Sequence, residues 1–129
     1  MKLATLMVLT PDLNEAERFY VDVLGFERLS RDETLLRLAH NGADLHVFRC
    51  EQPAPSVTHG QTAASVFVFA VDDLDAEMSR LKRLGVVFVH DRPGQNAFGR
   101  YAAFHAPGGN VHEIFEAAAV SSPACPPAR

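Results

Sequence analysis

Two stretches of the chain repeat the same order of apolar and polar positions. Residues 8–27, VLTPDLNEAERFYVDVLGFE, and residues 69–88, FAVDDLDAEMSRLKRLGVVF, each begin in a β-rich segment. Each then passes through an Asp-Leu pair, apolar residues at helical spacing, and a Leu-Gly pair that leads into another apolar segment. An internal repeat of this kind predicts that one supersecondary unit occurs twice.

Each copy contains an amphipathic helix with a recognisable start and end. Asp12 suits the N-cap, and Glu15 follows three residues later as in a capping box, so the first helix should begin at about residue 13. Asp73 takes the same place in the second copy, and Gly25 and Gly85 can end the helices in a left-handed conformation. The apolar stripes, which we interpret as core packing, are Ala16, Phe19, Tyr20, Val23 and Leu24, and Leu74, Met78, Leu81 and Leu84.

Short β-rich segments flank both helices. The predicted strands are 3–9, 26–30, 34–39 and 44–50 in the first copy, and 65–71, 86–90, 100–105 and 111–116 in the second. Asn41-Gly42 and Gly108-Gly109 supply the turn chemistry of hairpins. The pattern predicts an α+β fold, in which two βαβββ repeats form a curved mixed sheet that encloses a cavity, with the helices on its outer face. We expect a first unit at 1–50, a linker at 51–64, a second unit at 65–116 and a flexible tail at 117–129.

The alternation of strand side chains predicts which residues line the cavity. One face should carry Thr5, Met7 and Leu9, then His46 and Phe48, then Val66, Val68 and Ala70, and finally Val111, Glu113 and Phe115. In the segment GGNVHEIFE, His112 and Glu113 are adjacent, so they cannot both point inward. A carboxylate that points into an apolar interior needs a metal, a cationic or hydrogen-bonding partner, or a proton.

Composition and charge exclude several classes of function. The chain has 129 residues, a net charge of −4 and 47% hydrophobic residues, as in a soluble protein with one core or two small halves. No basic patch indicates nucleic acid or a membrane surface, and the apolar stretches are shorter than the roughly 18–20 residues of a membrane span. The N-terminal segment runs into Pro11-Asp12, unlike a signal peptide, so we expect a cytoplasmic protein. Cys50 and Cys125 are interpreted as reduced thiols.

Three segments together resemble a known family. They are PDLNEAERFYVDVLGFE, FAVDDLDAEMSRLKRLG and FGRYAAFHAPGGNVHEIFE, and the resemblance extends over residues 3–116. The chain resembles the vicinal oxygen chelate superfamily, which includes glyoxalase I, extradiol dioxygenases, methylmalonyl-CoA epimerase and the bleomycin resistance proteins. It departs at Ala106, where the family usually has an aspartate. The resemblance implies a small organic ligand or substrate and a homodimer.

The resemblance also implies where a metal would be held. Metalloenzymes of this family take their ligands from the first and fourth strands of both units, which correspond to Thr5, His46, Val66 and Glu113. Valine has no donor atom and threonine is a poor ligand, whereas a catalytic metal needs about three protein donors. We therefore expect no cofactor. A divalent metal held by His46 and Glu113 remains the alternative.

The leading functional prediction is metal-independent binding, by sequestration or carriage, of a small apolar or aromatic molecule. The predicted ligand-binding residues are His46, Glu113, Phe48, Phe115, Thr5, Met7, Val66, Val68 and Arg100. His46 or Arg100 would compensate the charge of Glu113. The alternatives are a divalent-metal-dependent lyase, isomerase or dioxygenase, with Glu113 and His46 as candidate catalytic residues, and a structural polar pair beside a vestigial cavity.

Other residues have less specific interpretations. Tyr101 is expected in the core, and His40, His90 and His105 near the surface. His59 lies in the predicted linker and is interpreted as a solvated loop residue. The loop at 91–99, DRPGQNAFG, is either an ordinary surface loop or a lid over the ligand.

Overall fold

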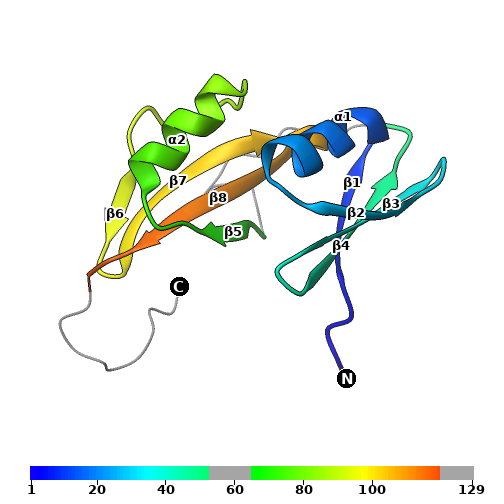
Figure 1. Cartoon of the computed structure of the whole chain (residues 1–129), viewed down its shortest axis with the longest axis horizontal. Helices are drawn as coiled ribbons and strands as arrows, with labels where there is room; N and C mark the ends of the chain where they lie inside the picture. The colour runs from blue at the N-terminus through cyan, green and yellow to red at the C-terminus, as the bar shows by residue number, and fades with distance from the viewer. Residues whose placement is uncertain (53–64, 120–129) are drawn as a thin grey trace. The chain divides into compact units, whose positions relative to one another are not determined.

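A computed structural model describes residues 1–52 and 65–119, which form two compact units (Figure 1). Within these residues, the first unit comprises 1–52 and 106–110, and the second comprises 65–105 and 111–119. Most of the predicted linker, including His59, and the tail from residue 120, including Cys125, lie outside the described residues. No helix of the described residues is long and apolar enough to cross a membrane.

The first unit is a βαβββ motif, as predicted. Its elements are β1 (Leu6–Thr10), α1 (Leu13–Glu17), η1 (Arg18–Val23), β2 (Glu27–Arg31), β3 (Leu35–His40) and β4 (Ala43–Arg49). The sheet order is β1-β4-β3-β2, in which β1 runs parallel to β4 and the other neighbours are antiparallel. Asn41 and Gly42 both adopt positive φ angles, 49° and 81°, which gives the tight β3–β4 hairpin.

The helix of the first unit begins at the predicted residue. The carboxylate of Asp12 accepts hydrogen bonds from the backbone N–H groups of Asn14 and Glu15 at 2.9 and 3.1 Å. These bonds satisfy two of the donors that a helix N-terminus leaves without a partner. After α1 the chain widens into the π-helical turns of η1, and Gly25 follows at a φ of 84°.

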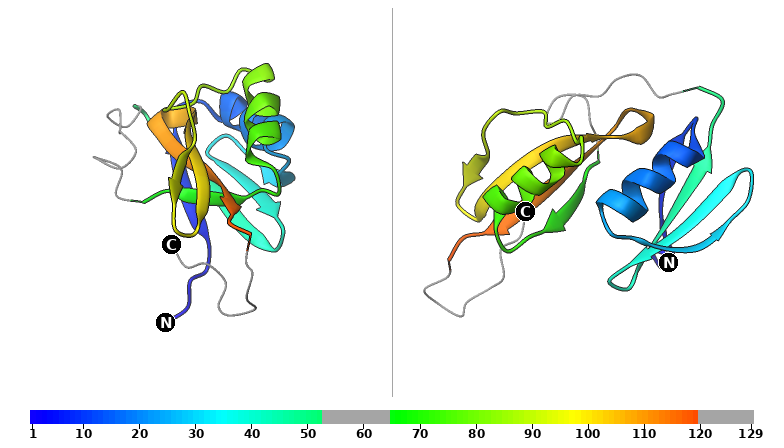
Figure 2. Two further views of the ribbon diagram at one scale, coloured as in Figure 1. Left: turned by 90° about the vertical axis from the view of Figure 1, so that its left-hand side faces the viewer. Right: turned by 45° about the horizontal axis from the view of Figure 1, so that its top comes forward.

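The core of the first unit lies between this helix and one face of the sheet. The buried side chains are Val8, Thr10, Leu13, Ala16, Tyr20, Phe26, Leu36, Leu38, Leu45 and Val47. Figure 2 shows α1 lying across the sheet. Tyr20 is fully buried and packs edge-on against Phe26, in agreement with its interpretation as a core residue. His40 stacks on Phe26 with ring centroids 4.9 Å apart, so it is partly buried at the edge of this core.

The second unit repeats the βαβββ motif, except that one of its strands lies later in the chain than the sequence predicts. Its elements are β5 (Phe67–Ala70), α2 (Leu74–Arg83), β6 (Gly94–Asn96), β7 (Gly99–Ala106) and β8 (Asn110–Ala117), in the sheet order β5-β8-β7-β6. β5 is parallel to β8, and α2 lies over the sheet (Figure 1). As predicted, Asp73 caps α2 through the backbone N–H of Ala76, and Gly85 follows with a φ of 90°.

The predicted strand at 86–90 is reduced to a single bridge. Phe88 pairs with Phe104 of β7, and the backbone N–H groups of Val89 and His105 donate to the oxygens of Ala103 and Val87 at 2.8 and 2.9 Å. The longer pairing at this edge of β7 is made by β6, inside the predicted loop 91–99. The turn forms because the Asn96 side chain accepts from the backbone N–H groups of Phe98 and Gly99. Residues 94–96 of the predicted loop are therefore one arm of a hairpin.

The turn between β7 and β8 belongs to the first unit, although the sequence placed all of 65–116 in the second. This turn, η2 (Pro107–Gly109), packs on β1, and the Asn110 side chain donates to the backbone oxygen of Leu9 at 3.3 Å. A Cβ on Gly108 would collide with that same Leu9 oxygen. Glycine is therefore required where the two backbones approach.

Candidate functional site

One face of the first sheet is turned away from α1 and carries exposed apolar side chains. In β1, Met7 is 57% and Leu9 is 48% exposed, whereas their neighbour Val8 is buried in the core. The alternating side chains of β3 and β4 follow the same rule. We call this surface the open face of the first sheet and define it by Met7, Leu9, Leu35, Arg37, His46 and Phe48.

The strand register arranges part of the open face into an apolar row. Phe48 lies opposite Leu9 on one side and opposite Leu35 on the other. Directly opposed side chains have Cβ atoms about 4.5–5.5 Å apart, so the three form a continuous surface. Phe48 and Leu35 are both half-buried, which leaves part of each accessible. A flat apolar ligand could pack against this row.

The neighbouring row is polar. His46 lies opposite Met7 and Arg37, and Arg37 in turn lies opposite Ser30 of β2. The His46 ring meets Phe48 edge-on, with centroids 6.4 Å apart. Arg37 was not among the residues that the sequence analysis singled out. Its spacing of two from Leu35 placed it on the same face, but only the register places it beside His46.

Thr5, the remaining predicted ligand-binding residue of the first unit, lies just before β1. Its hydroxyl donates to the backbone oxygen of Asp44 at 3.2 Å. This bond ties the start of β1 to β4, so Thr5 has a structural contact of its own. Asp44 and the opposed Ala39 begin a third row of the same face.

In the second unit, His112 and Glu113 point to opposite faces of β8, as the alternation predicts. His112 stacks on Phe67 with ring centroids 4.9 Å apart and also meets Phe69 and Phe104, which places it on the α2 side of the sheet. Glu113 is 2% exposed, lies opposite Val68 in the register, and shares its face with the buried Phe115. Val68 is 44% exposed and Val66 is half-buried.

His112 is a core residue that happens to be titratable. It is 2% exposed, and burial lowers the pKa of its imidazole from 6.5 to about 4. The ring is therefore neutral at physiological pH and packs as an aromatic side chain. The sequence predicted its side of the strand but not the aromatic cluster around it.

Arg100 lies away from the face of Glu113. Its guanidinium forms two hydrogen bonds with Asp75 at 2.9 and 3.0 Å and lies 3.7 Å from Glu116. The pair lowers the pKa of the Asp75 carboxyl, because the guanidinium stabilises its charge. Glu116 also accepts from the backbone N–H of Leu74 at 2.7 Å. Arg100 therefore joins β7 to the start of α2, and the expectation that it compensates Glu113 does not fit this placement.

The predicted pair of His46 and Glu113 combines residues of different units. His46 belongs to the first unit and Glu113 to the second. The pairing of their side chains therefore stays a prediction, as does their joint contact with a ligand.

The four family positions for a metal do not make a suitable donor set. Val66 has no donor atom, and the Thr5 hydroxyl is engaged with the Asp44 carbonyl. One imidazole and one carboxylate remain, fewer than the three donors of a catalytic site. Within residues 1–52 and 65–119, no three His, Cys, Asp or Glu side chains are grouped as ligands.

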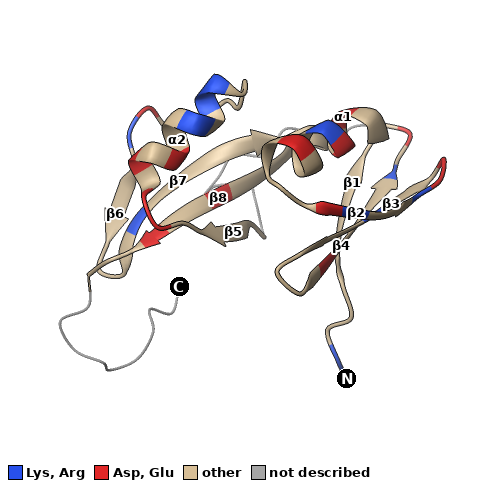
Figure 3. Cartoon of the chain, viewed as in Figure 1, with Lys and Arg blue, Asp and Glu red and all other residues tan. Residues whose placement is uncertain are grey.

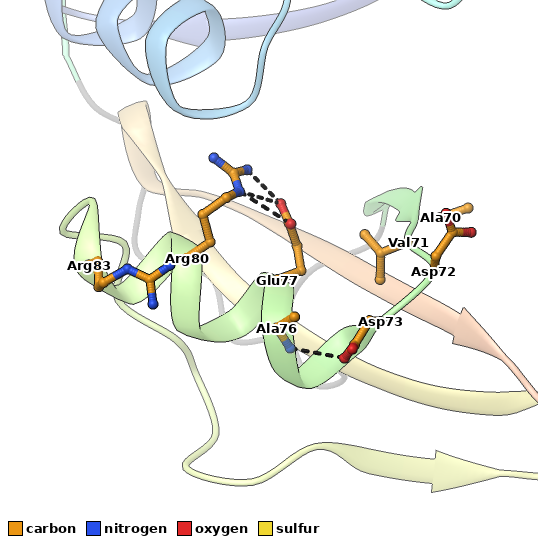
Figure 4. A pocket seen from close by; sticks show the side chains of 8 residues that line it. All are labelled: Ala70, Val71, Asp72, Asp73, Ala76, Glu77, Arg80 and Arg83. Carbon is orange, nitrogen blue, oxygen red and sulfur yellow. Dashed lines mark hydrogen bonds and ion pairs between the residues drawn. The ribbon is translucent and has the colours of Figure 1, made fainter.

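A second candidate surface is a hollow of about 560 Å³ beside α2 (Figure 4). Its lining residues are Ala70, Val71, Asp72, Asp73, Ala76, Glu77, Arg80 and Arg83. Acidic residues lie at the start of α2 and basic residues toward its end (Figure 3). Two of these charges are already paired, since Arg80 donates to Glu77 at 3.1 Å and the two side chains point toward each other (Figure 4). Most of the lining residues are charged, so the hollow suits an apolar ligand less well than the open face of the first sheet does.

The comparisons with known proteins agree with this fold. A model of the Glyoxalase/Bleomycin resistance protein/Dioxygenase superfamily matches residues 2–114. A search of curated proteins found no match.

Several solved structures are similar over most of their length. The antibiotic-binding protein TnmS3 from Streptomyces sp. CB03234 is 27% identical, with a TM-score of 0.62 over 92% of this chain and 99% of its own. The fosfomycin resistance protein FosX from Listeria monocytogenes is 17% identical, with a TM-score of 0.75 over 92% and 94%. Lactoylglutathione lyase from Agrobacterium tumefaciens is 21% identical, with a TM-score of 0.67 over 89% and 92%.

Proposed function

The chain belongs to the Glyoxalase/Bleomycin resistance protein/Dioxygenase superfamily, and from that premise we propose that it binds a small, mostly apolar organic molecule without a resident metal. The role would be to sequester or carry that molecule. The observation that carries the proposal is the open face of the first sheet, where exposed Met7 and Leu9 adjoin His46 and Phe48.

An exposed apolar sheet face is costly unless something covers it. Each Å² of apolar surface removed from water contributes about 25 cal/mol, so covering a few of these side chains supplies several kcal/mol toward binding. Small-molecule sites are typically apolar with a few polar groups that orient the ligand. The row of Leu9, Phe48 and Leu35 beside His46 has this composition.

The poor metal donor set favours binding over metal chemistry. His46 and Glu113 alone would hold a divalent ion weakly, and neither Thr5 nor Val66 adds a suitable ligand. The similarity to TnmS3, an antibiotic-binding protein, supports the same class of function. The competing activity, a metal-dependent lyase, isomerase or dioxygenase, would require donors beyond these four positions.

The test is to identify and then titrate a ligand. Native mass spectrometry of the purified chain should reveal a co-purified organic molecule, and titration with small aromatic compounds should raise the melting temperature. Phe48→Ala should weaken binding about tenfold, which corresponds to roughly 1.4 kcal/mol of lost apolar contact. Phe98→Ala is the matched control, because Phe98 is also exposed, at 43%, but lies in the β6–β7 turn of the second unit.

Metal content distinguishes the two activities. Protein purified without chelator should contain no stoichiometric divalent ion. An ion bound at one per chain and lost in both His46→Ala and Glu113→Gln would contradict the proposal and favour the metalloenzyme.

We also propose that the protein acts in the cytoplasm as a homodimer. The outer strand of each parallel pair, β1 in the first unit and β5 in the second, is an edge of its sheet, and such edges favour pairing with another chain. Light scattering should give twice the chain mass of 14.1 kDa. A mass of one chain at all accessible concentrations would contradict the dimer.

A further inference from the structure

Arg37 places a cation on the open face of the first sheet, among side chains that are otherwise largely apolar. The side chain is half-buried and lies directly opposite His46 in the β3–β4 register. Within the described residues, no ion pair or hydrogen bond involves its guanidinium, whereas Arg28 and Arg31 of the same unit both pair with Glu17. An arginine presents five N–H donors in a planar fork that matches the two oxygens of a carboxylate.

We propose that the ligand of this face is an organic anion, an aryl or alkyl carboxylate whose acid group is held by Arg37 and His46. The inference rests on the proposed function, since it names the chemical class of molecule that the same face would bind. Opposed side chains on neighbouring strands have Cβ atoms about 5 Å apart, so one carboxylate can reach the guanidinium and an imidazole N–H together. Ser30, opposite Arg37 on β2, adds a hydroxyl donor to the same row.

The rows on either side determine which way the ligand points. The apolar row of Leu9, Phe48 and Leu35 lies two residues along the strands from the polar row, a distance of about 7 Å at 3.3–3.4 Å per residue. That spacing is close to the separation between a carboxyl group and the far edge of a two-ring aromatic, so the rings of such a ligand extend from the polar row onto the apolar row. The apolar body can therefore lie on Phe48 while the acid meets Arg37.

The row on the other side of the polar row disfavours an anion. The row on the other side of His46 carries Asp44 on β4 and, opposite Ala39, Glu27 on β2. Two carboxylates there would repel the acid group of a ligand and attract a cation. The charge order of the three rows thus selects both the sign of the ligand and its orientation.

The experiment compares three probes of one shape with the full-length chain. The probes are 2-naphthoate, its neutral isostere 2-naphthamide and the cation 2-naphthylmethylammonium, titrated by calorimetry or by thermal shift. We expect naphthoate to bind at least about tenfold more tightly than naphthamide, as for a charge-assisted hydrogen-bonded pair. Arg37→Gln should abolish that preference, and Arg37→Lys should retain part of it, because lysine keeps the charge but loses the fork.

The matched control is Arg49→Gln. Arg49 is an exposed arginine on β4, three residues from His46 and therefore on the opposite side of the strand. It should leave the preference for naphthoate unchanged, whereas Phe48→Ala should weaken naphthoate and naphthamide alike. Far-UV circular dichroism of each variant should match that of the wild type, so that a loss of binding reports on the site.

The outcomes separate this inference from the proposed function. Equal binding of naphthoate and naphthamide, a preference that persists in Arg37→Gln, or tightest binding of the cation would overturn the anion inference and leave the binding function standing. Failure of all three probes to bind the wild-type chain would count against the proposed function itself and would remove the inference with it.

Discussion

The stability of the second unit should depend on pH through His112. In the folded chain the imidazole is 2% exposed among Phe67, Phe69 and Phe104, and burial lowers its pKa to about 4. In the unfolded chain the pKa returns to about 6.5. The unfolded state therefore binds a proton more readily than the folded state between these two values, and acid shifts the equilibrium toward unfolding.

The sign and size follow from the two pKa values. Above pH 6.5 both states are neutral at this position and the stability is fully present. As the pH falls from 6.5 to 4, the free energy of unfolding decreases by up to about 1.4 kcal/mol per pH unit. The loss amounts to about 2–3 kcal/mol at pH 4.5 and levels off at about 3 kcal/mol below pH 4, where both states carry the proton.

Urea denaturation at pH 7.5 and at pH 4.5 measures this effect. His112→Phe keeps an aromatic ring in the cluster and removes the titration. Between the two pH values this variant should therefore lose about 2–3 kcal/mol less stability than the wild type. His105→Gln is the matched control, because His105 is exposed on β7 and should leave the difference unchanged. The reasoning would be refuted if His112→Phe and the wild type lost equal stability between the two pH values.

Three further substitutions test local features of the fold by denaturation. Asp12→Ala removes the cap of α1 and should lower the free energy of unfolding by about 1 kcal/mol, whereas Asp12→Asn, which keeps the acceptor, should cost less; equal losses would argue against the cap. Glu116→Ala should cost about 1–2 kcal/mol, because the N–H of Leu74 loses its acceptor at the start of α2; an unchanged unfolding midpoint would contradict this. Gly94→Ala should cost about 1–3 kcal/mol, since the added Cβ meets the ring of Tyr101, and Tyr101→Ala in the same chain should recover part of the loss; without recovery the collision is not the cause.

The ends of the helices could be predicted from sequence because their causes are local. Asp12 and Asp73 cap the donors of residues only two or three positions away, and Gly25 and Gly85 take the positive φ angles that few other residues adopt. The repeat of these signals also predicted two βαβββ units, which the structure confirms. The alternation of side chains also predicted that Met7 and Leu9 share one face of their strand, and that His46 and Phe48 share one face of theirs.

The strand at 86–90 could not be judged from its own residues. Val86, Val87, Phe88 and Val89 are apolar and β-branched or aromatic, as in a strand, yet only an isolated bridge forms there. The edge strand beside β7 is instead β6, Gly94–Asn96, a short polar segment without apolar alternation. Its place depends on the Asn96 turn and on the packing of the Tyr101 ring against Gly94, which are contacts between residues that the periodicity does not connect.

The partners of charged side chains were decided by tertiary structure alone. The sequence determined that Arg37 and Arg100 lie in strands and that His112 and Glu113 point to opposite faces of β8, because the period of a strand is a local property. The register of β3 against β4 placed Arg37 beside His46, and the packing of α2 on its sheet placed Arg100 against Asp75. Register and helix packing depend on the fit of distant segments, so the sequence by itself could assign the faces but not the contacts on them.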